Sequence, residues 1–391
     1  DFLSGSRQLA AHGAQILASA EGDRAFPHRG LHDGEDFDLG GLTLRALATP
    51  GHTLEHVSFL LLEDAKPLAL FTGGALLVGA VARTDLVDPD RTEELARQAY
   101  RSLHQRILVL PDDVPLYPTH GAGSFCSAPA GAERTTTIGR ERASNPLLAA
   151  QSEDAFVAML VASLGSYPTY FRRLAEANRR GPRVLRPWPS LAQLDAREAR
   201  TRLDDGAVAV DVRPIEDYAA GHIPGALSIA LRPAFATWLG WLVDSEQDVV
   251  FVVGADQDRD DLVSQALKIG YEKLAGELTG GMAAWRMAGY AERRIDLVSA
   301  AELPSSTLVD VRQTPEFSAG HIPHALHREL GSLAGSRDLP DGPLTVMCEH
   351  GPRGMTGASL LERAGRRELS VLVGGPREWS ALSGTQLISA A

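Results

Sequence analysis

Short apolar runs alternate with helix-like segments through the second half of the chain. The runs are rich in β-branched residues and span 207–212, 249–253, 307–311 and 344–347. Such alternation is typical of a parallel sheet with helices on both faces. In these folds the functional residues lie beyond the carboxyl ends of the strands. The pattern therefore predicts α/β domains and places the chemistry just after each run.

The first half shows a different pattern. Turns separate apolar strands at 42–47, 57–62 and 68–71, and from about residue 135 to 178 the pattern becomes helical. The stretch 179–190 holds three prolines and four arginines, which is typical of a linker. The first half is therefore expected to form a separate unit.

An internal repeat divides the second half into two copies. Each copy contains Asp-Val-Arg, then Ala-Gly-His-Ile-Pro, then Gly-Gly-x-x-x-Trp. These motifs lie at 211–213, 220–224 and 280–285 in the first copy, and at 310–312, 319–323 and 374–379 in the second. Two ordered series of this kind indicate a duplicated domain. The predicted organisation is a unit at 1–180, a linker at 181–190, and two domains at 191–293 and 294–391.

Composition narrows the function. A chain of 391 residues exceeds one ordinary core, and its net charge of −12 argues against a nucleic-acid partner. No stretch has the apolar length of a membrane span. The two cysteines, Cys126 and Cys348, do not form the framework of a secreted protein, so we expect a cytoplasmic location. The sequence does not decide whether the chain forms homo-oligomers.

Cys348 follows an apolar run and precedes a helix-like segment, on a tight loop that contains Gly and Pro. Backbone N–H groups, the positive end of the helix and Arg353 would stabilise a thiolate there. The predicted loop also comprises Glu349, His350, Gly351, Pro352 and Gly354. A thiolate in such a loop can accept, carry and release a sulfur atom. The alternative is a buried structural cysteine.

The repeats resemble rhodanese domains over about half of the chain. The resemblance implies that Cys348 carries a persulfide, that Arg353 helps to stabilise the charged sulfur, and that thiosulfate or a small thiol persulfide is the partner. Cysteine phosphatases with a similar loop place the arginine one residue further along, whereas Arg353 is five positions after Cys348. Glu349 adds negative charge, which disfavours a dianionic substrate. His350 could tune the loop or shuttle protons, but the favoured interpretation is a solvated loop residue.

The first copy lacks this chemistry. Aligning Gly270 with Gly365 places Val253 at the position of Cys348 and Asp258 at that of Arg353. An acid in place of the arginine would repel a persulfide anion. The first copy is therefore predicted to be an inactive scaffold or docking module.

The first unit resembles metallo-β-lactamase-fold hydrolases of the persulfide dioxygenase and glyoxalase II type. The resemblance rests on Thr-Pro-Gly-His-Thr at 49–53, Pro-Thr-His-Gly at 118–121, and Phe-Thr-Gly at 71–73 followed by Arg-Thr-Asp at 83–85. It implies an incomplete αββα unit that binds one iron or zinc ion. Imidazoles on strand-end loops suit either metal.

This chain departs from the family pattern at its metal ligands. The resemblance makes His52 and His120 the ligands, with Asp1 a weaker one and Asp85 a supporting group. Phe2 replaces the final His of the family's His-x-His-x-Asp-His motif, and Gly74 replaces an aspartate. Because Asp1 lies inside that motif, we expect a fragment whose first part is missing. The alternative is that both histidines are structural residues of a degenerate fold.

Three functions are compatible with these residues. The favoured one is persulfide metabolism, in which a metal site oxidises a thiol persulfide and Cys348 transfers sulfur. The second is sulfur transfer alone, beside a degenerate thioester hydrolase-like unit. The third is a non-catalytic sulfur carrier or docking module.

Overall fold

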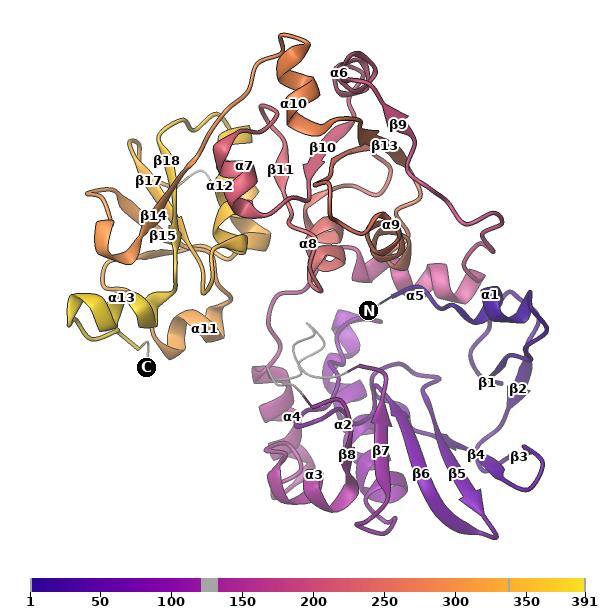
Figure 1. The fold of residues 1–391 in the computed structure, drawn as a ribbon. Helices are drawn as coiled ribbons and strands as arrows, with labels where there is room; N and C mark the ends of the chain where they lie inside the picture. The colour runs from indigo at the N-terminus through magenta and orange to yellow at the C-terminus, as the bar shows by residue number, and fades with distance from the viewer. Residues whose placement is uncertain (1, 121–132, 337, 390–391) are drawn as a thin grey trace. The chain divides into compact units, whose positions relative to one another are not determined.

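Two compact units, residues 1–185 and 186–391, make up the chain in the computed structural model (Figure 1). The structure describes residues 2–120, 133–336 and 338–389. Asp1 and Cys126 lie outside these ranges. Within them, no helix combines the length and the apolar character that a bilayer-crossing segment needs.

A six-stranded mixed sheet forms the centre of the first unit, with strand order β3-β4-β5-β6-β7-β8. These strands are β3 (Asp36–Asp38), β4 (Thr43–Ala48), β5 (Val57–Glu63), β6 (Lys66–Gly73), β7 (Pro115–Pro118) and β8 (Thr136–Thr137), and a separate parallel pair is β1 (Leu17–Ser19) with β2 (Arg29–Leu31). The helices are α1 (Ser6–Ala10), η1 (Pro89–Arg91), α2 (Thr92–Ser102), η2 (Leu103–Ile107), α3 (Ile138–Ser144), α4 (Glu153–Ala162) and α5 (Phe171–Arg180). The three strands expected from the apolar pattern are confirmed as β4, β5 and β6.

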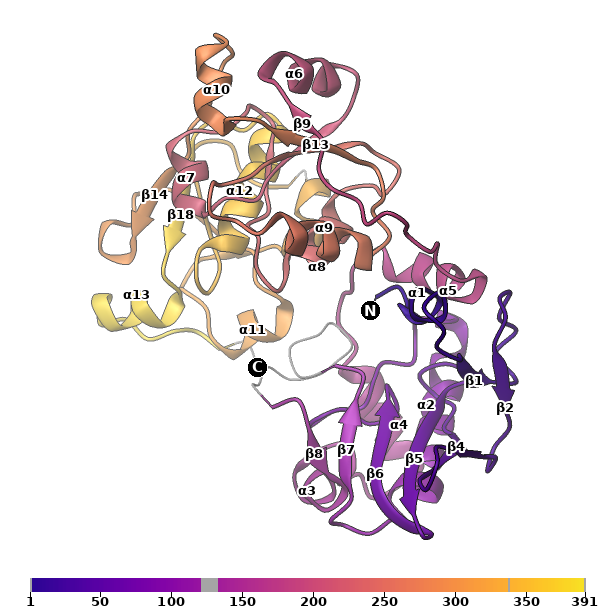
Figure 2. The ribbon, with the colours of Figure 1, turned by 45° about the vertical axis from the view of Figure 1, so that its right-hand side comes forward.

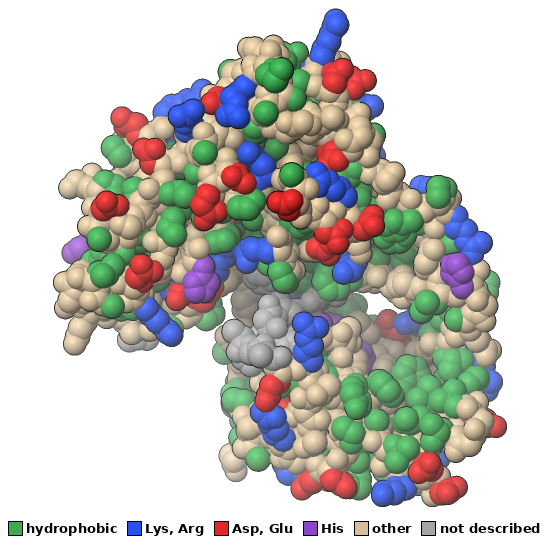
Figure 3. Space-filling view, viewed as in Figure 1, with side chains coloured by type: hydrophobic (Ala, Val, Ile, Leu, Met, Phe, Trp, Pro, Cys, Tyr) green, Lys and Arg blue, Asp and Glu red, His purple; other side chains and the backbone are tan. Residues whose placement is uncertain are grey.

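The period of two along β5 assigns its side chains to opposite faces. Ser58, Leu60 and Leu62 are buried, and the two leucines join a core with residues of α2 and α4, such as Ala96 and Phe156. The intervening side chains stay partly exposed on the other face, and Figure 3 shows hydrophobic side chains gathered over these strands.

Two five-stranded parallel sheets form the second unit, one for each copy of the repeat (Figure 2). The first has the order β11-β10-β12-β13-β9, with β9 (Gln193–Leu194), β10 (Val208–Asp211), β11 (Leu227–Ser228), β12 (Val249–Val252) and β13 (Leu274–Leu278). The second has the order β14-β18-β17-β15-β16, with β14 (Asp296–Ser299), β15 (Thr307–Asp310), β16 (Leu326–His327), β17 (Leu344–Met347) and β18 (Leu369–Val373). Every residue of β10, β12 and β17 is buried, as expected for strands with helices on both faces.

The helices of the second unit also follow the repeat. The first copy contains α6 (Ala196–Asp204), α7 (Ile215–Ala220), α8 (Phe235–Leu242), α9 (Arg259–Lys268) and α10 (Gly281–Met287). The second contains η3 (Ala300–Glu302), α11 (Thr314–Ala319), η4 (Leu330–Gly335), α12 (Pro352–Arg363) and α13 (Pro376–Ser383). The predicted α/β fold with parallel sheets is confirmed.

The repeat motifs make the same bonds in both copies. Arg213 donates to Asp211 (Nη2–Oδ2 2.6 Å) and to the carbonyl of Gly221, and Arg312 donates to Asp310 (2.7 Å) and to the carbonyl of Gly320. All of these side chains are buried or nearly so. The Asp-Val-Arg motif therefore fixes the turn after the strand, and its role in both copies is structural.

Candidate functional site

Cys348 lies directly after β17, at the carboxyl edge of the second sheet. Its side chain is buried, with 1% of the residue exposed, and the backbone N–H of Gly351 donates to Sγ at 3.2 Å. Gly351 precedes α12 with φ of +98°, a left-handed conformation that favours glycine. This conformation turns its N–H toward the sulfur, so the loop is built to stabilise negative charge on Cys348.

Two ion pairs surround this loop. Arg353 donates from both Nη atoms to Glu316, at 2.6 and 2.7 Å. Burial opposes the charge of Arg353, but the hydrogen bonds to Glu316 and the nearby Cys348 sulfur raise its pKa above the ordinary value. Arg353 therefore acts on Cys348 through its charge, while its hydrogen bonds go to Glu316. The sequence interpretation omitted Glu316 from the site, although the first copy also has an acid, Asp217, at the equivalent position.

The other loop residues have separate roles. Glu349 accepts a hydrogen bond from Arg312 at 3.2 Å, and His350 is exposed. Pro352 begins α12, where a missing N–H costs nothing. A Cβ at Gly354 would lie 3.2 Å from Cγ1 of Val371, so this glycine allows α12 to pack closely on the sheet.

The first copy has a different loop at the equivalent edge of its sheet. Asp211 pairs with Val252 and Asp310 with Met347, so Val253 occupies the position of Cys348. Asp258 caps α9 by accepting from the N–H of Asp260 and Asp261.

The polarity of that loop also differs. The Nη1 of Arg259 donates to the carbonyls of Gly254, Ala255 and Gln257, at 2.8, 3.1 and 2.7 Å. These carbonyl oxygens point to a guanidinium, whereas the N–H of Gly351 points to the sulfur of Cys348. The first copy therefore lacks a thiol at this position, and its loop presents carbonyl oxygens where the second copy presents the N–H of Gly351.

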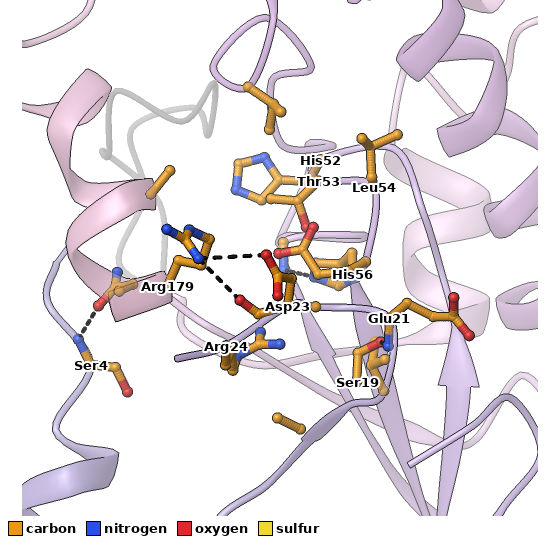
Figure 4. A pocket seen from close by; sticks show the side chains of 18 of the residues that line it. Ser4, Ser19, Glu21, Asp23, Arg24, His52, Thr53, Leu54, His56 and Arg179 are labelled. Atoms are coloured by element: carbon orange, nitrogen blue, oxygen red, sulfur yellow. Dashed lines mark hydrogen bonds and ion pairs between the residues drawn. The ribbon is translucent and has the colours of Figure 1, made fainter. Parts of the chain in front are cut away.

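A cavity of about 1060 Å³ lies in the first unit, and Figure 4 shows His52 among the side chains that line it. His52 and His120 both line it. The Nδ1 of His52 lies 2.8 Å from the carbonyl of Arg83, which can only accept, so this nitrogen carries the proton and Nε2 keeps its lone pair. Burial lowers the pKa of His52, which keeps the ring neutral. His52 thus has the tautomer of a metal ligand.

His56 supports the same loop. The N–H of Gly74 donates to its Nε2 at 3.0 Å, and its Nδ1 lies 2.8 Å from Oγ1 of Thr49. Burial lowers the pKa of His56 to about 3. Both ring nitrogens are occupied, so His56 is not available to a metal.

Asp85 acts through a neighbour. Its carboxylate accepts two hydrogen bonds of 2.7 Å from the buried Arg83. Since the carbonyl of Arg83 accepts from His52, this ion pair helps to hold the imidazole in place.

The described donors do not fit an iron or zinc site. Within the described ranges, no three His, Cys, Asp or Glu side chains are placed so that they could hold a metal ion. The aspartate position of the family is Gly74, and a Cβ there would lie 2.6 Å from Cδ2 of His52. The ring of His52 therefore occupies the space that a side chain at position 74 would need. Two imidazoles fall short of the usual three or four ligands.

A family model for rhodanese-like domains matches residues 195–288 and 295–382. The human mitochondrial persulfide dioxygenase ETHE1 is 31% identical over 157 residues, which cover 39% of this chain and 55% of the relative. A metallo-β-lactamase structure from Staphylococcus aureus subsp. aureus COL is 28% identical, covers 71% of this chain and 81% of that chain, and has a TM-score of 0.62. The chain is a metallo-β-lactamase-fold unit fused to two rhodanese-like domains.

A further relative of the metallo-β-lactamase-fold unit is the hydroxyacylglutathione hydrolase GloC of Haemophilus influenzae. It is 33% identical over 131 residues, which cover 33% of this chain and 52% of the relative. The chain spans about half the length of the curated relatives that it matches. The likeness of the first unit thus extends to both dioxygenases and hydrolases.

Proposed function

We propose that the second rhodanese-like domain transfers sulfane sulfur through Cys348. The observation that carries the proposal is the buried sulfur that accepts a hydrogen bond from the Gly351 N–H at 3.2 Å. A hydrogen bond to a charged group is worth about 1.5–3 kcal/mol, so it favours the thiolate and the persulfide anion over their neutral forms.

The reaction has two steps. The Cys348 thiolate attacks the outer sulfur of thiosulfate, an S–S bond forms, and sulfite leaves with the electron pair of the S–S bond that breaks. A nucleophilic acceptor such as cyanide then attacks the outer sulfur of the persulfide, and the thiolate is regenerated. A thiol persulfide can replace thiosulfate as donor. Because Cys348 must be reduced, we propose a reducing compartment such as the cytoplasm.

Sulfur transfer from thiosulfate to cyanide tests the proposal. Cys348→Ser should abolish turnover, while Cys126→Ser, which removes the other cysteine, should leave it unchanged. Turnover that survives in Cys348→Ser would refute the assignment of the nucleophile. An inactive wild-type chain that binds a partner protein through residues 190–293 would support the docking function instead.

Oxidation of a thiol persulfide in the first unit is the second candidate. It is supported by the free Nε2 of His52, which lies with His120 on one cavity, and by the likeness to a persulfide dioxygenase. The described donors do not complete a metal site, so no step of this reaction is derived. Oxygen uptake with glutathione persulfide tests this function, and hydrolysis of a glutathione thioester tests the hydrolase alternative.

A further inference from the structure

The two rhodanese-like domains interlock beside Cys348, along α12. In the second turn of that helix, Oγ1 of Thr356 donates to the carbonyl of Ser228 at 2.7 Å. The N–H of Ser228 donates to Oγ of Ser359 at 3.1 Å, and the buried His222 lies 3.2 Å from Glu362. The segment after β11 therefore belongs to the surroundings of the cysteine loop.

This segment is also held at its other end. Residues 229–231 run along the carboxyl end of β10, because the N–H groups of Ile229 and Leu231 donate to the carbonyls of Asp211 and Val212. Beyond it, Trp241 of α8 packs so closely on η4 of the second domain that a Cβ at Gly331 would lie 2.1 Å from the indole. The conformation of residues 229–234 is thus fixed relative to Cys348.

The cysteine loop itself contacts the first domain. A Cβ at Gly351 would lie 2.8 Å from Cδ1 of Ile215. The residue that donates to Cys348 therefore packs on the carboxyl edge of the first sheet. The inactive domain forms one wall of the active loop.

Arg232 lies on this wall with its side chain half-buried. Among the residues that the structure describes, its guanidinium has neither a hydrogen bond nor an ion pair. Burial lowers the pKa of Arg232, which Cys348 tends to raise and the like charge of Arg353 tends to lower. The nearby carboxylates are already engaged, since Glu316 pairs with Arg353 and Glu349 with Arg312. The guanidinium therefore has donors that no described residue uses, on a segment held beside the cysteine loop.

We infer that Arg232 of the inactive domain binds the anionic group of the sulfur donor at Cys348. The ligand class is a small anionic sulfur compound, with either the sulfonate oxygens of thiosulfate or the carboxylate of a thiol persulfide as the bound group. A guanidinium presents donors that match either oxyanion, and it binds best where water is partly excluded. The inference rests on the proposed sulfur transfer for its substrate, and it gives the first rhodanese-like domain a role in substrate binding.

Alkylation of Cys348 tests the inference without sulfur chemistry. Iodoacetate and iodoacetamide form the same S–C bond and release iodide, but only iodoacetate is an anion. In the full chain, the ratio of the two rates at Cys348, followed by peptide mass spectrometry, should fall about tenfold in Arg232→Ala and recover in part in Arg232→Lys. Arg202→Ala, an exposed arginine on α6 that pairs with Asp248, is the matched control and should keep the ratio.

A merely structural role for Arg232 would change both rates together. An unchanged ratio in Arg232→Ala therefore overturns the inference. Resistance of Cys348 to both reagents also overturns it, because no anion could then reach the sulfur beside Arg232.

Sulfur-transfer kinetics separate this inference from the proposed function. Arg232→Ala should raise the KM for thiosulfate about tenfold with little change in kcat, and parallel effects with glutathione persulfide would extend the site to carboxylates. Wild-type chain that shows the iodoacetate preference but transfers no sulfur would refute the proposed function and keep the anion site. Transfer with the same KM in Arg232→Ala would keep the function and refute the anion site.

Discussion

Gly351→Ala probes the feature on which sulfur transfer depends. Gly351 has φ of +98°, and an added Cβ would lie 2.8 Å from Cδ1 of Ile215. The left-handed conformation costs an alanine about 1–2 kcal/mol. The contact with Ile215 is shorter than real Cβ atoms accept, so the loop must move or the isoleucine must give way.

Either movement displaces the N–H that donates to Cys348 at 3.2 Å. Loss of a hydrogen bond to a charged sulfur removes about 1.5–3 kcal/mol of stabilisation. Since about 1.4 kcal/mol corresponds to tenfold in rate, kcat/KM for thiosulfate should fall about 10- to 100-fold. The Cys348 thiol itself remains in the chain, so the loss reports the loop and not the nucleophile.

Two further variants separate the causes. Gly342 also has φ of +98°, but nothing lies within 4 Å of an added Cβ, so Gly342→Ala shares the strain without the contact. Gly342→Ala should lower stability by about 1–2 kcal/mol and keep the transfer rate. In Gly351→Ala with Ile215→Ala, recovery of the rate would identify the contact as the cause, whereas no recovery would identify the backbone strain.

The assay combines thiosulfate–cyanide kinetics with unfolding followed by tryptophan fluorescence. All five tryptophans of the chain lie between residues 188 and 379, so the fluorescence reports the two rhodanese-like domains and not the first unit. The reasoning would be refuted if Gly351→Ala had the stability of Gly342→Ala and kept kcat/KM within about twofold of wild type. The N–H of residue 351 would then contribute nothing to the transfer rate.

Three other outcomes follow from the same structure. Lowering the pH from about 7 to about 5 should destabilise the first unit by about 2 kcal/mol through His56. Its folded pKa of about 3 lies below the unfolded 6.5, so only the unfolded chain gains the proton as the pH falls. Hydrogen exchange of β5 measures this loss, and an equal loss in His56→Gln would contradict it. Elemental analysis of the chain should find well under one equivalent of iron or zinc. Gly74→Asp should not raise the metal content, because the imidazole of His52 occupies the space that the new side chain needs. Stoichiometric metal in either protein would contradict a site of only two donors. Val253→Cys in a Cys348→Ser background should transfer no sulfur, because the carbonyls of its loop face Arg259; any thiosulfate turnover would contradict this.

The strands of the second unit could be predicted from the sequence because their apolar character is visible in each short segment alone. Strands with helices on both faces are apolar at every position, so β10, β12 and β17 stand out as continuous runs. The same logic placed Cys348 at a strand end, and the structure has it directly after β17. The repeat also allowed the two copies to be aligned, with Val253 at the position equivalent to Cys348. The strand registers of the two sheets agree with this alignment.

The site's charges could not be predicted in the same way, since they depend on tertiary contacts. The sequence predicts that Arg353 stabilises the sulfur, but it does not indicate that the hydrogen bonds of Arg353 go to Glu316 on α11. Arg232 belongs to the other domain, and no motif links it to Cys348. His52 and His120, predicted as metal ligands, line one cavity, but only the coordinates show that the His52 ring fills the space beside Gly74.

The charge balance at Cys348 explains why an inactive domain would be retained beside it. Once the thiolate forms, it joins Asp310, Glu316 and Glu349, while Arg312 and Arg353 are the cations that pair with these acids. Four negative groups against two positive ones give −2, which would repel an anionic sulfur donor. Arg232 reduces this imbalance to −1 and is the cation of the three that no carboxylate in the described structure engages. A second domain without the first would keep its nucleophile and its N–H donor, but it would lose the charge that draws the donor in.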